Sequence, residues 1–128
     1  MSWGVIGAVA LGGALGSVGR FVVASAVGHA VGTAFPWGTL AVNVIGGFVI
    51  GALAEIFALR WSVTPELRAL LVTGVLGGFT TFSAFSLEIV AMIERGAWAP
   101  ATAYIVASVA LSLLACFAGL WSMRAALA

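Results

Sequence analysis

Long apolar runs, separated by short polar or Pro/Gly stretches, dominate this chain from one end to the other. A helix needs about 20 apolar residues to cross the hydrocarbon core of a membrane. Four runs meet this requirement, at about residues 3–27, 39–59, 66–93 and 99–122. The pattern therefore predicts an all-α membrane protein with four transmembrane helices, which form a single transmembrane domain over residues 1–128.

The breaks between the runs carry the usual helix stop and start signals. Pro36 marks the end of the first helix, and Thr64 stands before Pro65 and Glu66 as a predicted N-cap of the third. The last break ends in Pro100. Because all three breaks are short, consecutive helices are predicted to be antiparallel neighbours.

The composition agrees with this class, since 63% of the residues are hydrophobic and 7% are charged, against roughly a quarter charged in soluble domains. We expect membrane lipid around the chain and no nucleic-acid partner. His29, expected in a loop, and Cys116, expected in the fourth helix, provide no nucleophile–base pair. An enzyme is therefore not expected.

The arginines are almost evenly shared between the two sides of the membrane. Arg60, Arg68 and Arg124 fall on one side, and Arg20 and Arg95 on the other. Since Lys/Arg asymmetry orients a membrane protein, this near balance favours insertion in both orientations. A single orientation with weak signals stays open as the alternative.

A homodimer is also expected, because four glycine-rich helices enclose little volume and would share any polar path with a partner. Two copies in opposite orientations would form an antiparallel homodimer, the inverted repeat of larger transporters. Close helix packing is indicated by three G-x-x-x-G spacings, at Gly12/Gly16, Gly47/Gly51 and Gly74/Gly78.

The stretch "GGFTTFSAFS", residues 77–86, interrupts the third apolar run. Gly77 and Gly78 each cost a helix roughly 1 kcal/mol relative to Ala, and Thr80, Thr81 and Ser83 offer the backbone other hydrogen bonds. The third helix is thus predicted to be broken near residues 77–82. Irregular backbone at membrane depth is typical of an ion site.

Phe79, Phe82 and Phe85 are spaced by three, which places them along one face of a helix. Such a stripe is commonly core or lipid contact. These rings stand among hydroxyl groups, however, and inward ring edges are electropositive enough to stabilise a small anion.

Polar residues also recur in the second and fourth helices. Thr39 and Asn43 share one face of the second helix, where interhelical hydrogen bonding is the ordinary role. Tyr104, Ser108 and Ser112 recur every four residues and predict a line of hydroxyl groups along the fourth helix. The alternative is that each serine bonds back to its own helix.

Three charged residues lie inside the predicted helices, beyond the outermost turn at either end. Arg20 comes late in the first helix, where it lines a polar path or reaches for the interface. Glu55 is expected as an interfacial charge near Arg60. Glu88 lies one turn beyond the interrupted stretch and is either a vestibule residue or a proton-coupling carboxylate.

Together, three stretches resemble the Fluc (CrcB) family of small fluoride channels: "GGALGSVGRF", "PWGTLAVNVIGGF" and "GVLGGFTTFSAFSLE". Their order and spacing match over the whole chain. The sequence departs from the usual pattern at Ser17, Phe21 and Ala84, and Ala84 removes a hydroxyl between the candidate pore rings Phe82 and Phe85.

The resemblance implies a passive channel in the bacterial inner membrane that exports fluoride and so reduces its toxicity. It also implies a dual-topology antiparallel homodimer with two pores. A structural Na⁺ at the dimer centre would be held by the main-chain carbonyls of Gly77 and Thr80, and Arg20 and Glu88 would line a vestibule. The pore residues implied are Asn43, Thr81, Phe82, Ser83, Phe85, Tyr104, Ser108 and Ser112.

The competing hypothesis is a small proton-coupled exporter, also a dual-topology dimer of four-helix chains. That class requires a carboxylate deep in the bilayer, and Glu88 is the one fair candidate in the third helix.

Overall fold

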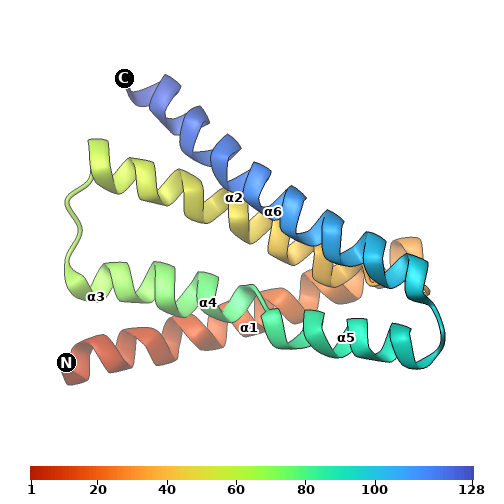
Figure 1. Cartoon of the computed structure of the whole chain (residues 1–128). Helices are drawn as coiled ribbons and strands as arrows, with labels where there is room; N and C mark the ends of the chain where they lie inside the picture. Colours follow the sequence, from red (N-terminus) through yellow and green to blue (C-terminus); the bar gives the residue numbers. More distant parts are fainter.

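The computed structural model describes residues 1–128 and contains only helices and their connections (Figure 1). Helix α1 covers Trp3–Val31, α2 covers Trp37–Leu59 and α6 covers Trp98–Leu127, with a further helical segment at Pro65–Glu94. All four segments are long and apolar enough to cross a membrane, as predicted. Helix α1 continues past residue 27 and so includes His29, which was wrongly expected in a loop.

The third segment consists of several pieces. Helix α3, Pro65–Arg68, continues into the π-helix η1, Ala69–Leu76, and then into α4, Gly77–Phe79. Thr80 (φ −83°, ψ 158°) and Thr81 (φ −152°, ψ 122°) have extended backbone angles, and α5 then covers Phe82–Glu94. Two non-helical residues therefore lie near the middle of a membrane-length segment.

Side-chain caps and glycine turns set several helix ends. The hydroxyls of Ser2, Thr64 and Thr81 each accept a backbone N–H from the first turn of the helix that follows, which confirms the predicted cap at Thr64. Gly32 (φ 89°) ends α1, and Gly96 (φ 76°) turns the chain between α5 and α6; positive φ angles favour glycine.

The membrane segments form two closely packed pairs. One pair is α2 with α6, and the other is α1 with the first half of the third segment, which contains η1 and α4. The pairs spread apart toward the end of the molecule that holds both termini (Figure 1). The one hydrophobic core lies toward the opposite end and consists of Leu40, Phe85, Met92, Ala101 and Tyr104.

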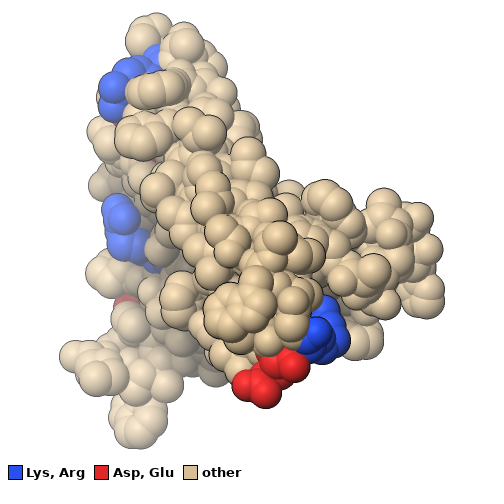
Figure 2. Space-filling model, turned by 45° about the vertical axis from the view of Figure 1, so that its right-hand side comes forward, with Lys and Arg blue, Asp and Glu red and all other residues tan.

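Only 18 of the 128 residues are buried, so most apolar side chains are at least partly exposed on the outside of the chain. Figure 2 shows the charged side chains in a few small groups near the edges of one face, with an uncharged area between them. This distribution fits a chain whose middle lies in hydrocarbon.

Glycines of α1 allow the close approach of η1. A Cβ atom at Gly12 would collide with the carbonyl oxygen of Leu70, and one at Gly16 with that of Val75. Both carbonyl groups belong to the π-helix η1, so η1 meets α1 at positions that lack side chains. No local pattern in residues 69–76 indicates π-helical geometry, so η1 was not predicted.

A second glycine seam joins α2 to α6. A Cβ atom at Gly47 would collide with the carbonyl oxygen of Ser112, one at Gly51 with that of Cys116, and one at Gly119 with backbone of α2. The G-x-x-x-G spacings predicted to mediate helix packing therefore do so, at backbone-to-backbone contact.

We predict that Gly51→Ala destabilises the protein by about 1–3 kcal/mol, because the added methyl group would overlap backbone that cannot move aside freely. The measurement is the thermal unfolding midpoint in detergent. Gly7→Ala is the matched control, since a Cβ atom there meets nothing within 4 Å. Equal midpoints for the two variants would contradict this account of the seam.

Candidate functional site

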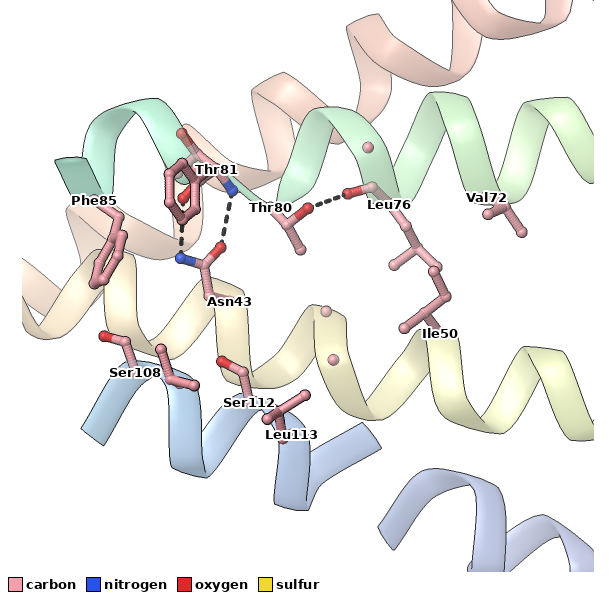
Figure 3. Close-up of a pocket in the computed structure, with 15 residues that line it drawn as sticks. Asn43, Ile50, Val72, Leu76, Thr80, Thr81, Phe85, Ser108, Ser112 and Leu113 are labelled. Atoms are coloured by element: carbon pink, nitrogen blue, oxygen red, sulfur yellow. Dashed lines mark hydrogen bonds between the residues drawn. The ribbon is translucent and has the colours of Figure 1, made fainter. Parts of the chain in front are cut away.

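A cavity of about 440 Å³ lies between α2, the interrupted third segment and α6 (Figure 3). No charged side chain lines it. The 15 lining residues are Asn43, Gly46, Gly47, Ile50, Val72, Leu76, Gly77, Thr80, Thr81, Phe82, Phe85, Ser108, Val109, Ser112 and Leu113.

Asn43 of α2 pairs with the backbone of Thr81. Its Nδ2 donates to the Thr81 carbonyl at 3.0 Å, and its Oδ1 accepts the Thr81 N–H at 2.8 Å (Figure 3). These bonds satisfy the peptide groups that extended geometry removes from the helical ladder. The second N–H of the amide has no partner in the chain and remains available to a ligand.

The hydroxyl groups of the interrupted stretch are mostly occupied. Thr80 donates to the Leu76 carbonyl at 2.9 Å, and Thr81 accepts the Ala84 N–H at 3.1 Å as the N-cap of α5. Ser83 lies 3.4 Å from the Thr81 hydroxyl, but it is exposed and does not line the cavity. The structure thus places Thr81 at the cavity and Ser83 outside it.

The backbone leaves helical geometry inside the range predicted for the break, residues 77–82. Gly77 has helical angles (φ −62°, ψ −38°), and Gly78 is helical and packs against the backbone of Gly13. Of these two glycines, Gly78 packs closely against α1, whereas a Cβ atom at Gly77 would meet only the Val72 carbonyl oxygen at 3.7 Å. The extended residues are Thr80 and Thr81.

Phe82 and Phe85 both line the cavity, with their ring centroids 5.5 Å apart. Phe85 is buried, with 8% of its surface exposed, whereas Phe82 is 78% exposed. Phe79 does not join them, since its ring lies beside Gly19 of α1 and Gly46 of α2. The expected three-residue stripe is therefore wrong for Phe79, because the extended residues separate it from α5.

The serines of α6 point into the cavity from the side opposite the interrupted segment (Figure 3). The Ser108 hydroxyl is buried and has no hydrogen-bond partner. Ser112 also makes no side-chain hydrogen bond, so neither serine bonds back to its own helix. An unpartnered buried hydroxyl indicates a place for a polar ligand.

Tyr104 lies behind the cavity wall and does not line the cavity. It is fully buried, and its ring meets Phe85 edge-on at 5.1 Å between centroids. Its hydroxyl donates to Glu88 at 2.9 Å, and the Thr39 hydroxyl donates to the same carboxylate at 2.8 Å. The expected line of three hydroxyls is therefore divided, with two at the cavity and one at Glu88.

Glu88 lines a second cavity of about 240 Å³ near the α1–α2 connection, together with Thr39 and Arg95. Arg20 is partly exposed on α1 and lines neither cavity. The two predicted vestibule residues are thus not brought together within one chain. The interhelical hydrogen bonds expected for Thr39 and Asn43 are both present.

The carbonyl groups near the break offer ligands for a cation. Gly77 is exposed and Thr80 is partly exposed, and both line the larger cavity. No backbone N–H donates to the Thr80 carbonyl. Open main-chain carbonyls of unwound segments are typical Na⁺ ligands in membrane proteins, so these residues fit such an ion.

Sequence reasoning missed the apolar wall of the cavity, which includes Ile50, Val72, Leu76, Val109 and Leu113. These residues carry no distinguishing signal, since similar side chains fill all four membrane segments. The cavity as a whole offers a small solute a few neutral hydrogen-bond donors, two aromatic rings and an apolar surface, without a fixed charge.

The family model described as "CrcB-like protein, Camphor Resistance (CrcB)" matches residues 7–120. A "Fluoride-specific ion channel FluC" of a Chelativorans species is 57% identical over 119 residues, which covers 93% of this chain and 95% of the relative. Proteins of the same name from Rhodospirillum centenum and Rhizobium meliloti are 53% and 57% identical, over 94% and 91% of this chain and 96% and 94% of their own lengths.

We predict that Asn43→Leu loosens the interrupted segment, because it removes both partners of the Thr81 peptide groups at about 1–3 kcal/mol for each unsatisfied group. Hydrogen–deuterium exchange over residues 77–86 measures the effect and should become faster. Ser112→Ala is the control, since Ser112 makes no bond to this segment. Unchanged exchange in Asn43→Leu would show that other contacts hold the break.

Proposed function

This chain belongs to the CrcB-like family, and on that basis we propose that it is a fluoride-specific ion channel. The family is one of ion channels and not of enzymes, in agreement with the sequence analysis. One observation carries the proposal: the larger cavity has neutral donors, aromatic rings and an unpartnered buried hydroxyl, but no charged side chain.

Fluoride is small and strongly hydrated, so a channel must replace its water with hydrogen-bond donors and positive dipoles. The free Asn43 N–H and the hydroxyls of Ser108 and Ser112 are suitable donors, and the edges of Phe82 and Phe85 add positive partial charge. None of these groups is ionised. The site would thus bind fluoride without trapping it.

The remaining candidate residues take supporting roles in this proposal. Thr81 lines the pore and caps α5, and Ser83 adds a hydroxyl beside it. Tyr104 would support the wall of the larger cavity by packing against Phe85, and its hydroxyl donates to Glu88 of the smaller cavity. Arg20 and Glu88 would serve aqueous vestibules formed by the complete assembly.

The assembly proposed is an antiparallel homodimer of dual topology. A single chain leaves its cavity incomplete, since the lining residues Phe82 and Leu113 are 78% and 58% exposed. A second copy would cover them. The nearly even distribution of arginines supports opposite orientations, and one cavity from each copy gives two pores.

A structural Na⁺ at the dimer centre would be held by the Gly77 and Thr80 carbonyls of both copies. The open Thr80 carbonyl and the exposed position of Gly77 support this assignment. When bound, the ion would supply a fixed positive charge that compensates for carbonyl dipoles facing each other.

Transport would be passive, because no titratable side chain lines the larger cavity. Fluoride would then follow its own electrochemical gradient and leave the bacterial cytoplasm across the inner membrane when it accumulates inside. Such export reduces fluoride toxicity.

The test is anion efflux from liposomes that contain the purified protein, recorded with fluoride and chloride electrodes under the same voltage. We predict fast fluoride release without chloride release. Release of both anions would disprove the selectivity, and the absence of fluoride release would disprove the function.

We predict that Phe82→Ile abolishes fluoride efflux, because a branched aliphatic side chain has no electropositive edge. Dimer formation, measured by size-exclusion chromatography, should be retained. The control is Phe117→Ile, since Phe117 is exposed and lies outside the cavity. Undiminished efflux in Phe82→Ile would remove this ring from the mechanism.

Glu88→Gln distinguishes the channel from a proton-coupled exporter, since it removes a titratable charge and keeps an acceptor for Tyr104 or Thr39. We predict that fluoride efflux persists in this variant without a pH gradient. Transport that requires a pH gradient in the unaltered protein and disappears in Glu88→Gln would favour the exporter.

A further inference from the structure

Many polar side chains inside the membrane segments have a partner within the chain. Glu55 is buried and forms an ion pair with Arg124 at 2.9 Å, which differs from the expectation of an interfacial charge near Arg60. Thr102 of α6 donates to the Trp98 carbonyl of its own helix. Such pairing is expected because hydrocarbon offers no hydrogen-bond partners. A polar side chain at membrane depth without a partner therefore indicates a contact outside the single chain.

Two exposed hydroxyl groups of the third segment are left without a well-formed hydrogen bond. Thr73 lies in η1 and makes no side-chain hydrogen bond, whereas Thr80 and Ser86 of the same segment donate to carbonyls of the preceding turn. The Ser83 hydroxyl lies 3.4 Å from that of Thr81, which is longer than the usual O–H···O distance. Neither Thr73 nor Ser83 lines a cavity, so neither finds a partner there.

The face that carries Thr73 is turned away from α1. The residues of this segment that pack against α1 are Leu70, Gly74, Val75 and Gly78. Thr73 and Gly77 are both exposed, and, being about one turn apart, they share the opposite face. A Cβ atom at Gly77 would meet only the Val72 carbonyl oxygen, at 3.7 Å. The backbone of another helix can therefore come close at Gly77.

Lipid cannot complete this face. The Thr80 carbonyl accepts no backbone N–H, and unpaired carbonyl and hydroxyl groups at membrane depth are tolerated only against protein or water. The face offers hydroxyl donors at Thr73 and Ser83 and a carbonyl acceptor at Thr80. A surface with both kinds of group can pair with a copy of itself, as the self-complementary interface of a two-fold dimer requires.

The relative direction of two copies decides which residues meet. Where two third segments cross antiparallel with residues 77–80 in contact, the earlier residues of each copy meet the later residues of the other. Thr73 precedes Gly77 by four positions, and Ser83 follows Thr80 by three. The unpaired hydroxyl groups of one copy then fall opposite those of the other.

We propose that the third segments of two antiparallel copies cross at Gly77, and that Thr73 of each copy forms a hydrogen bond with Ser83 of the partner subunit. The interface rests on the antiparallel dimer of the proposed function and names the residues that form it. By symmetry each dimer contains two such bonds. Thr73, which the proposed ion path leaves without a role, is an interface residue.

Disulfide formation tests this contact directly. In a background with Cys116 replaced by Ser, the double variant Thr73→Cys, Ser83→Cys is reconstituted in liposomes and oxidised with copper phenanthroline. We expect covalent dimers on non-reducing gels, because the two thiols would face each other within disulfide reach. The matched control is Thr102→Cys, Ser83→Cys, which should give no covalent dimer, since Thr102 lies in the first turns of α6, away from this face.

The pattern of cross-links distinguishes the possible arrangements. Covalent dimers from the single variant Thr73→Cys would indicate a parallel crossing and overturn the proposal. The absence of cross-links in the double variant would also overturn it. Failure of the unaltered protein to release fluoride from liposomes would count against the proposed function, whereas normal release without cross-links would count against this interface alone.

Conservative variants measure the contribution of the Thr73 hydroxyl. Thr73→Val keeps the shape of the side chain and removes the hydroxyl, whereas Thr73→Ser keeps the hydroxyl. We expect Thr73→Val to weaken dimerisation in lipid roughly five- to tenfold, since two interhelical bonds of modest strength are lost, and Thr73→Ser to retain it. The measurement is single-molecule photobleaching at decreasing protein-to-lipid ratios. Equal dimer fractions for Thr73→Val and the unaltered protein would disprove the bond.

Discussion

A backbone that leaves helical geometry inside a membrane must find hydrogen-bond partners within the protein or in a water-filled cavity, because the hydrocarbon core provides none. The Asn43 amide provides both partners for the Thr81 peptide groups, at 3.0 and 2.8 Å. The Thr81 hydroxyl then starts α5, and the Thr80 carbonyl is left open toward the cavity. This one side chain therefore pairs both peptide groups of Thr81 at the point where the chain enters α5.

The glycine seams hold together the helices whose side chains line the cavity. Each helix pair is joined at backbone-to-backbone contact, through Gly12 and Gly16 on one side and Gly47 and Gly51 on the other. Side chains cannot enter the seams, so they project into the space between the pairs, where some of them line the larger cavity. The cavity forms there because the pairs spread apart and the interrupted segment turns away from a straight course (Figure 1).

The sequence was sufficient for the four membrane segments and the packing glycines, since both follow from local patterns. It was insufficient wherever the position of a residue depends on contacts between different helices. The spacing of Phe79 indicated a shared face with α5 only on the assumption of a continuous helix. Gly77 and Gly78 were placed at the break from their propensity, but both have helical backbone, and Gly78 packs against the backbone of α1. The partner of Glu55 lies 69 positions away, and no spacing rule reaches that far.

Helix α6 is held by a carboxylate near each end of its polar face, through Tyr104 to Glu88 and through Arg124 to Glu55. Both carboxylates lie outside the larger cavity, so their charges fix the helix without entering the proposed ion path. The Ser108 hydroxyl between them has no internal partner and is already desolvated. A donor held in this way needs little reorganisation when an anion arrives, and a neutral donor releases the anion more readily than a fixed positive charge would. The ionised partners Glu55 and Glu88 can therefore hold α6 in place while the neutral Ser108 hydroxyl of the same helix contacts the anion.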